Sequence, residues 1–203
     1  MHLFLYEWAT GGGLTHQTGP LPKSLLREGA AMVSAIAADL VTIHQCHVST
    51  LRDSRVADLC LPGCDVVELH SPAAHRREIE RLASAADGTL VIAPEFDHIL
   101  QQTAEWTTAA GGHLLSPSSS FIQLAADKQQ TAERLARANI PVPLAVQLEP
   151  DEPLPSDFVY PAVLKPIDGA GSQGIQLLTS PRDTPLTHAW RRRLEQYLSL
   201  IHI

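Results

Sequence analysis

The chain has 203 residues, of which 44% are hydrophobic and 18% are charged. This length allows one large or two small domains, and the composition excludes a disordered, collagen-like or coiled-coil protein. The 15 basic and 22 acidic residues give a formal net charge of −7. Because most of the basic residues are scattered along the chain, we expect no nucleic acid partner.

The sequence shows no sign of export or of membrane insertion. The first eight residues lack a basic segment and reach Glu7 before a long apolar run forms, so they do not resemble a signal peptide. No stretch is long enough to span a bilayer. The three cysteines are an odd number, which argues against a disulfide framework. We therefore expect a cytoplasmic protein.

Strand and helix patterns alternate in the first half of the chain. The apolar run 3–6 is followed by three glycines and then by apolar residues at helical spacing over 26–40. Ser71 and Pro72 supply the N-cap and first turn of another helix, and a third runs from Phe96 to the glycine pair 111–112. Further strands are expected at 41–48, 65–69 and 89–93. This alternation predicts a parallel sheet covered by helices.

The composition changes near residue 117, where small polar residues appear. We therefore expect two domains, at 1–117 and 118–203. Two short helical patterns lead to Asn139, and an acidic, proline-rich turn at 149–155 follows. The arginines at 191–193 have the character of a solvated helix face. Residues 144–148 are mostly apolar, and β-type runs predict strands at 158–165 and 175–178.

A glycine-rich segment at 167–174 contains the pattern GxGxxG. A dinucleotide site requires a helix directly after the glycines, and residues 175–181 are too few and too β-like for one. A Walker-type loop requires Gly-Lys-Ser/Thr, which is absent. The favoured interpretation is a hairpin loop whose backbone N–H groups approach a triphosphate, with Lys165 adding a positive charge.

Lys165 precedes this loop, and an Asp127-Lys128 pair lies well upstream. In this order of motifs the chain resembles the ATP-grasp superfamily. The segment from Asp127 to Pro143 is similar to the opening segment of the ATP-grasp domain, which implies that Lys128 reaches a nucleotide phosphate. Lys165 and the glycine-rich segment look like the second lysine and the triphosphate-covering loop of that family.

The resemblance continues into 194–198, which is similar to the strand and hinge that hold adenine. It implies that Glu195 meets the exocyclic amine of the base, that backbone near Leu198 meets the ring, and that Tyr197 supports them. The residues expected to bind ATP are Lys128, Lys165, Asp168, Gly169, Ala170, Gly171, Ser172, Gln173, Gly174, Glu195, Tyr197 and Leu198.

The first half resembles the domain that precedes ATP-grasp modules. Segments 6–13 and 93–97 look nearest to a subgroup that contains tyramine-glutamate ligases of methanofuran-type cofactor synthesis. Residues at the carboxyl ends of parallel strands often meet ligands, although the glycines also suit a plain turn and the acids could simply be exposed. The candidate substrate contacts are Glu7, Thr10, Gly11, Gly12, Gly13 and Glu95.

The expected fold is α/β, with a Rossmann-like pre-ATP-grasp domain followed by an incomplete ATP-grasp nucleotide-binding domain of α+β type. The resemblance implies an ATP- and Mg²⁺-dependent ligase that joins a small carboxylic acid to an amine through an acyl phosphate. In that family the metal ligands come from a further lobe, which has no counterpart before Ile203. We therefore expect no metal ligands here and no turnover by the truncated chain.

Two alternatives remain open. The chain could be a nucleotide-binding or interaction fragment without turnover, or a nicotinamide-dependent oxidoreductase that uses the literal GxGxxG. The latter requires a helix after Gly174. A zinc site is disfavoured, because the candidate ligands lack paired C-x2-C spacing. These candidates are His44, Cys46, His47, Cys60 and Cys64.

Overall fold

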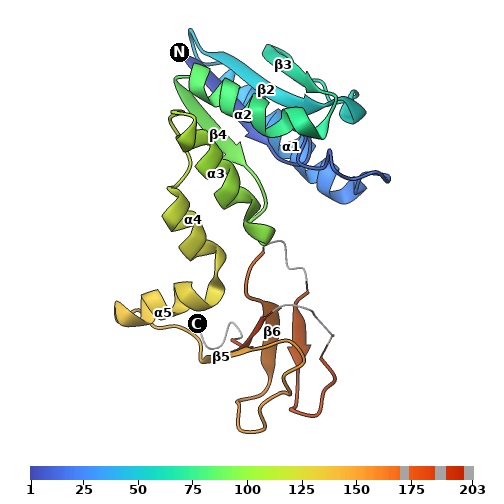
Figure 1. The fold of residues 1–203 in the computed structure, drawn as a ribbon. Coiled ribbons are helices and arrows are strands. Elements are labelled where there is room, and N and C mark those ends of the chain that lie inside the picture. Colours follow the sequence, from blue (N-terminus) through green and yellow to red (C-terminus); the bar gives the residue numbers. More distant parts are fainter. Residues whose placement is uncertain (170–173, 186–190, 199–203) are drawn as a thin grey trace. The chain divides into compact units, whose positions relative to one another are not determined.

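The computed structural model describes residues 1–169, 174–185 and 191–198. Its internal contacts divide the chain into two compact units (Figure 1). The first contains residues 1–94 and 98–120, and the second contains residues 95–97 and 121–203. Since residues 95–97 group with the second unit, this division is not a single cut, and the domain boundary between residues 117 and 118 stays a prediction.

The first unit is built on a four-stranded parallel sheet in the order β3-β2-β1-β4. Its strands are β1 (His2–Glu7), β2 (His47–Asp53), β3 (Cys64–Leu69) and β4 (Gly88–Ile92). All four carboxyl ends lie at the same edge of the sheet, because the strands are parallel. The prediction of a parallel sheet is confirmed.

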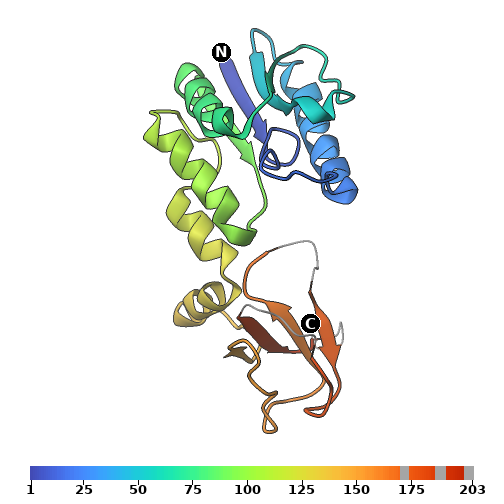
Figure 2. The same ribbon diagram turned by 45° about the vertical axis from the view of Figure 1, so that its right-hand side comes forward.

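Helices cover both faces of this sheet (Figure 2). Leu5 of β1 packs against Val33 of α1 on one face, and Phe4 and Tyr6 pack against α2 on the other, because side chains alternate along a strand. The α-helices are α1 (Lys23–Leu40), α2 (Pro72–Ala85) and α3 (Ile99–Ala109), and the 3-10 turns are Ser54–Val56 and Phe96–His98.

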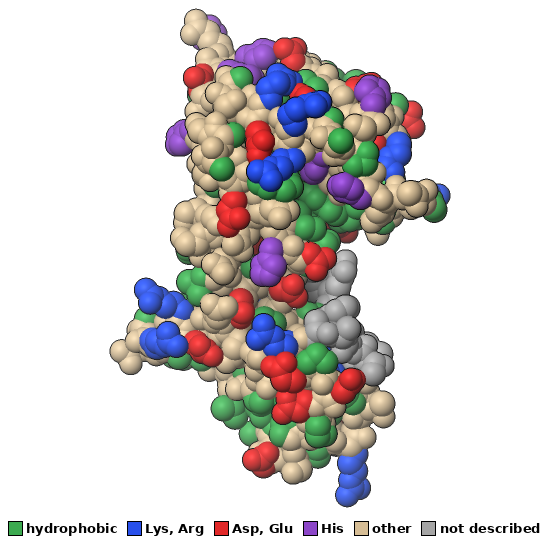
Figure 3. Space-filling view, viewed as in Figure 1, with side chains coloured by type: hydrophobic (Ala, Val, Ile, Leu, Met, Phe, Trp, Pro, Cys, Tyr) green, Lys and Arg blue, Asp and Glu red, His purple; other side chains and the backbone are tan. Residues whose placement is uncertain are grey.

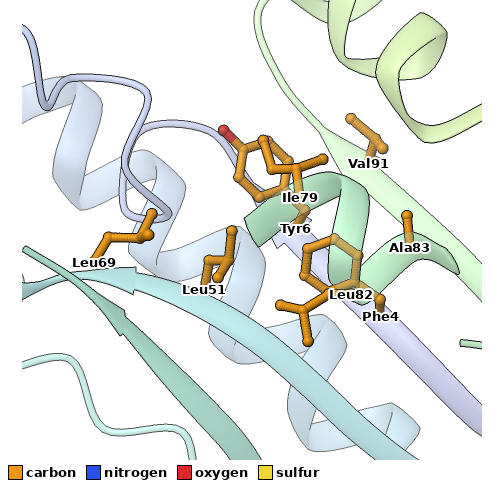
Figure 4. Packing of buried hydrophobic residues seen from close by; sticks show 8 residues of the cluster. All are labelled: Phe4, Tyr6, Leu51, Leu69, Ile79, Leu82, Ala83 and Val91. Carbon is orange, nitrogen blue, oxygen red and sulfur yellow. The ribbon is translucent and has the colours of Figure 1, made fainter. Parts of the chain in front are cut away.

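The core between the sheet and α2 contains residues from all four strands (Figure 4). Tyr6, Leu51 and Ile79 are almost fully buried in it, and Trp106 of α3 packs at its margin. The complete cluster is Phe4, Tyr6, Leu51, Leu69, Ile79, Leu82, Ala83 and Val91. The Tyr6 hydroxyl lies within this apolar cluster, so it needs an internal partner.

Two element boundaries predicted from the sequence are wrong. The strand expected at 41–48 begins only at His47, because α1 continues to Leu40 and the Val41 N–H still bonds the Ala37 carbonyl at 3.0 Å. Most of β2 consists of polar residues, so a search for apolar runs did not locate the strand correctly. The helix expected from Phe96 begins at Ile99, because Asp97 and His98 have positive φ angles of 52° and 57°.

The second unit contains an antiparallel sheet in the order β5-β8-β6-β7. Its strands are β5 (Ala145–Leu148), β6 (Ala162–Pro166), β7 (Gln176–Leu178) and β8 (Arg192–Gln196), and the helices α4 (Ser119–Ala126) and α5 (Lys128–Arg137) precede them. The strand predicted at 158–165 is shorter than expected, because Phe158 and Tyr160 pack on the sheet from the preceding loop.

One face of this second sheet is apolar. Leu148, Leu164 and Leu194 are nearly fully buried on it, together with Ala162 and Leu178. Since side chains alternate along strands, the neighbours of these residues point to the opposite face. Lys165 on β6 and Arg193 and Glu195 on β8 therefore share that opposite face.

None of the described helices is long and apolar enough to cross a membrane. On the face that Figure 3 shows, acidic and basic side chains are interspersed over the surface.

Candidate functional site

A hollow of about 210 Å³ in the second unit brings together three of the residues predicted to bind ATP. Lys128 comes from α5, Lys165 from β6 and Glu195 from β8. Of the chain's three lysines, two therefore line this one hollow. Its other lining residues are Ala125, Thr131, Ala132, Leu135, Val142, Pro143 and Arg193.

The strand register explains how the charged residues meet. Lys165 lies directly opposite Arg193 in the antiparallel pair of β6 and β8, so the two side chains point to the same face. Glu195 lies between these two cations. Its Oε1 accepts a hydrogen bond from Lys165 Nζ at 2.8 Å, and its Oε2 accepts one from Arg193 Nε at 2.9 Å. Burial opposes ionisation of Glu195, but these two bonds outweigh it and lower the pKa of the carboxyl.

Lys128 is attached to the start of the glycine-rich segment. It is the first residue of α5, whose N-cap Asp127 accepts a bond from the Gln130 N–H. Lys128 Nζ donates to the carbonyls of residues 167, 168 and 169 at 3.3, 2.8 and 2.7 Å. Burial and the neighbouring Lys165 ammonium lower the pKa of Lys128. The ammonium thus holds the backbone from which the glycine-rich segment departs.

The glycine-rich segment is described only at its two ends. Asp168 is exposed, and Gly169 and Gly174 have positive φ angles of 80° and 66°, which glycine adopts without strain. The predicted contacts Ala170, Gly171, Ser172 and Gln173 lie outside the described residues. After Gly174 the chain enters β7, a strand. The oxidoreductase interpretation, which needs a helix there, is therefore wrong.

The hinge residues Tyr197 and Leu198 follow β8 and are 42% and 41% exposed. The Tyr197 N–H donates to the Pro161 carbonyl at 3.2 Å, which extends the pairing with β6 by one bond. Both side chains are therefore accessible to a ligand. Their role in holding a base stays a prediction.

Arg193 is the residue of this site that the sequence analysis missed. The prediction of a solvated helix face for 191–193 is wrong, because Arg192–Gln196 is a strand and Arg193 is only 3% exposed. Its Nη1 also donates to the side-chain oxygen of Gln129 on α5. Three consecutive arginines are typical of a solvated surface. Only the folded structure shows that the Glu195 carboxylate and the Gln129 amide compensate the charge of Arg193. The sequence did contain one signal: Arg193 and Glu195 are two residues apart, so in a strand their side chains lie on the same face.

In the first unit, Glu7 lies under the loop that follows β1. The carboxylate is 3% exposed and accepts bonds from the Ala9 N–H at 2.9 Å and from the Thr10 N–H and hydroxyl at 2.8 and 2.6 Å. A β-carbon on Gly29 of α1 would lie 2.5 Å from Glu7 Oε2. Glu7 therefore joins β1, the loop and α1. Its contact with a substrate stays a prediction.

The three glycines of this loop each have a packing reason. A β-carbon on Gly11 would lie 2.4 Å from the Glu7 carbonyl, and one on Gly13 would lie 2.1 Å from the Trp8 ring. Gly12 has a φ angle of 104° and faces Leu69. The loop is thus close-packed from several sides. A substrate role for Thr10 and the glycines stays a prediction.

Two further polar contacts at this edge of the sheet escaped the sequence analysis. Arg55 donates to Asp53 at 2.7 Å and to the carbonyls of Leu14 and Gln17 at 2.8 and 2.9 Å, so it clamps the loop to β2. The Tyr6 hydroxyl pairs with His75 Nε2 at 2.7 Å inside the core. Their partners lie far apart in the sequence, and only the sheet brings them together.

The buried His75 should make the stability of the first unit depend on pH. Burial and the charge of His16 lower the pKa of His75 from about 6.5 to about 4, against the opposing effect of Asp53. Between these values the unfolded chain binds more protons, so stability falls as the pH falls. We expect a loss of about 2 kcal/mol between pH 7 and pH 5. Urea unfolding followed by tryptophan fluorescence measures this loss.

The His75→Gln variant should lack this part of the pH dependence, whereas the exposed control His44→Gln should keep it. Equal slopes of stability against pH in the unmodified chain and His75→Gln would contradict the assignment.

Glu95 groups with the second unit, where its negative charge acts on Lys128. The remaining predicted substrate residues, Glu7 and 10–13, lie in the first unit. Within residues 1–169, 174–185 and 191–198, no three His, Cys, Asp or Glu side chains gather in a way that could hold a metal ion. The described residues therefore do not fit a metal centre of their own.

Comparisons with known proteins support these expectations at the level of the family. A family model for the pre ATP-grasp 3 domain matches residues 46–122, and one for the ATP-grasp domain matches residues 125–196. Together the two matches cover most of the chain. The expected fold class is confirmed by them. No curated protein matches the sequence.

Solved structures share the fold at low identity. A protein from Archaeoglobus fulgidus assigned to the ATP-grasp superfamily has a TM-score of 0.65 at 20% identity, over 98% of this chain and 54% of that one. The D-alanine–D-alanine ligase of Bacillus anthracis, solved with ATP, has 0.61 at 12% identity, over 98% and 60%. The L-amino acid ligase of Bacillus licheniformis has 0.57 at 15%, over 97% and 46%. The chain spans about half the length of these proteins.

Proposed function

The chain belongs to the ATP-grasp superfamily, and we propose that it supplies the ATP-binding part of a ligase that joins a carboxylic acid to an amine. The observation that carries the proposal is the charge of the hollow in the second unit. Three cations and one anion line it, which leaves two positive charges in a chain whose net charge is −7. A polyphosphate is the kind of ligand that such a site attracts.

The remaining lining supports a nucleotide rather than a simple anion. Leu135, Val142 and Pro143 provide apolar surface of the kind that contacts a base. Glu195 provides a carboxylate, which accepts hydrogen bonds and so suits the exocyclic amine of adenine. Lys128 and Lys165 would contact phosphate oxygens, and Lys128 would exchange its carbonyl partners for them.

The proposed reaction has two steps. A carboxylate oxygen of the acid attacks the γ-phosphorus of ATP, and ADP leaves. The amine then attacks the carbonyl carbon of the acyl phosphate, which forms the amide and releases phosphate and a proton. The lysines would offset the negative charge of the triphosphate as the γ-phosphoryl group transfers. Two of the similar proteins are ligases by name, which agrees with this chemistry.

We propose tyramine-like amines and glutamate-like acids as the substrates, and cofactor biosynthesis as the process. The resemblance of segments 6–13 and 93–97 supports this choice. In this proposal Thr10 and the glycines 11–13 contact a substrate, and Glu7 and Glu95 are further candidate contacts. Magnesium would accompany ATP. The same proposal divides the chain into domains between residues 117 and 118. It also places the protein in the cytoplasm, without nucleic acid or membrane partners.

The first test is calorimetric titration of the chain with Mg-ATP, with Mg-ADP and inorganic triphosphate as comparisons. We expect one site per chain and tighter binding of ATP than of triphosphate, because the base adds contacts. The second test uses the full-length protein encoded by the gene. It measures the release of ADP when glutamate and tyramine are supplied as substrates. Binding without ADP release would support the fragment alternative, and no binding would reject the nucleotide site.

A further inference from the structure

Arg193 holds a position that the nucleotide proposal alone does not explain. Its side chain is buried at 3% exposure, directly opposite Lys165 in the antiparallel pair of β6 and β8. Like charges opposite each other destabilise a sheet, and a buried cation needs compensation. The site contains this compensation in Glu195, which accepts one bond from each cation.

The guanidinium also joins two elements of the second unit. Its Nε donates to Glu195 Oε2 on the same strand at 2.9 Å, and its Nη1 donates to the Gln129 side-chain oxygen on α5. Gln129 is oriented in turn by a bond from its amide nitrogen to Glu133 at 2.9 Å. A planar guanidinium can make both bonds at once, whereas a lysine ammonium has no such fixed fork. Arg193 thereby fixes Glu195 against the helix.

Both oxygens of Glu195 consequently have assigned partners, Lys165 at Oε1 and Arg193 at Oε2. This arrangement sets the direction in which the remaining lone pairs of the carboxylate face the hollow. A carboxylate only accepts hydrogen bonds. It therefore favours a base with an amino group at its edge over a base with a carbonyl there, provided that the carboxylate stays in place.

We propose that Arg193 is a positioning residue that sets the base selectivity of this site by holding Glu195. This inference rests on the proposed nucleotide-binding function. Arg193 also adds a positive charge to the hollow, which favours any nucleotide. Its specific effect, through Glu195, is on the preference for one base over another. Loss of the guanidinium should free Glu195 to turn toward Lys165 and should weaken discrimination between an amino and a carbonyl group.

The test compares calorimetric dissociation constants for Mg-ATP and Mg-ITP, because inosine carries a carbonyl where adenine carries its amine. The unmodified chain should prefer ATP by at least about tenfold. The Arg193→Met variant should bind ATP about tenfold more weakly and ITP about twofold more weakly. Methionine fills most of the volume of arginine, so the wall of the hollow remains. Arg193→Lys should recover part of the preference.

Two further variants keep the test decisive. Gln129→Met leaves the guanidinium in place but removes its helix partner, so it should reduce the preference by about threefold even if Arg193→Met fails to fold. Arg134→Met removes an exposed arginine of α5 that takes no part in these contacts, and it should change neither affinity.

The outcomes separate the inference from the proposed function. Equal losses of ATP and ITP affinity in Arg193→Met, or an unchanged preference in Gln129→Met, would overturn the positioning role while ATP binding stands. A chain that binds ATP and ITP equally before any substitution would overturn it too. A chain that binds no nucleotide would reject the proposed function and the role of Arg193 together.

Discussion

Replacement of Lys165 by methionine should weaken Mg-ATP binding to the chain by about 100-fold. Lys165 supplies one of the three cations of the hollow, and its ammonium is only partly exposed, at 20% for the side chain. The variant loses a charge-assisted contact with phosphate and also leaves Glu195 with one cation fewer. The carboxylate would then face the triphosphate with less compensation, so both effects act in the same direction. Calorimetric titration with Mg-ATP measures the change.

Lys23→Met is the matched control, because Lys23 is exposed at the start of α1 in the first unit. It removes the same charge from the chain and should leave the affinity unchanged. The salt dependence offers a second check, since loss of one phosphate contact should make the affinity less sensitive to ionic strength. Similar affinities for Lys165→Met and Lys23→Met would show that Lys165 does not contact the nucleotide.

Replacement of Glu7 by alanine should lower the free energy of unfolding of the first unit by at least about 3 kcal/mol. The carboxylate accepts three bonds from Ala9 and Thr10 in a position with 3% exposure. Without it, two backbone N–H groups lose their partners, and a cavity opens beside Gly29. The glycine loop should therefore lose its fixed shape. Urea unfolding measures the effect, and the fluorescence of Trp8 and Trp106 reports on this unit.

Glu28→Ala removes an exposed acid from α1 and should change the stability by less than about 0.5 kcal/mol. Glu7→Gln keeps the volume but replaces one acceptor oxygen with a donor group, so its effect should lie between the two. Gly29→Ala places a β-carbon 2.5 Å from the Glu7 carboxylate and should be destabilising as well. Normal stability in Glu7→Ala would mean that the acid serves only a ligand.

The sequence by itself determined the α/β class and the elements with clear periodicity. Apolar runs located β1, β3 and β4, and helical spacing located α1 and α2, because burial of one face imposes these periods. The order of Lys128, Lys165 and the glycine-rich segment indicated the family, which the two domain matches support. The same argument failed for β2, since its buried Ser49 and Thr50 interrupt the apolar run.

Only the tertiary structure decided which charged residues work together. Lys165, Arg193 and Glu195 meet because the register of β6 and β8 places them on one face of the sheet. That register cannot be predicted from the sequence of either strand alone. The burial of Glu7 under its loop depends likewise on the close approach of Gly29 from α1. Local sequence reports which residues can be buried or charged. Their partners are chosen by contacts across the fold, where the cost of burying a charge decides which arrangements are stable.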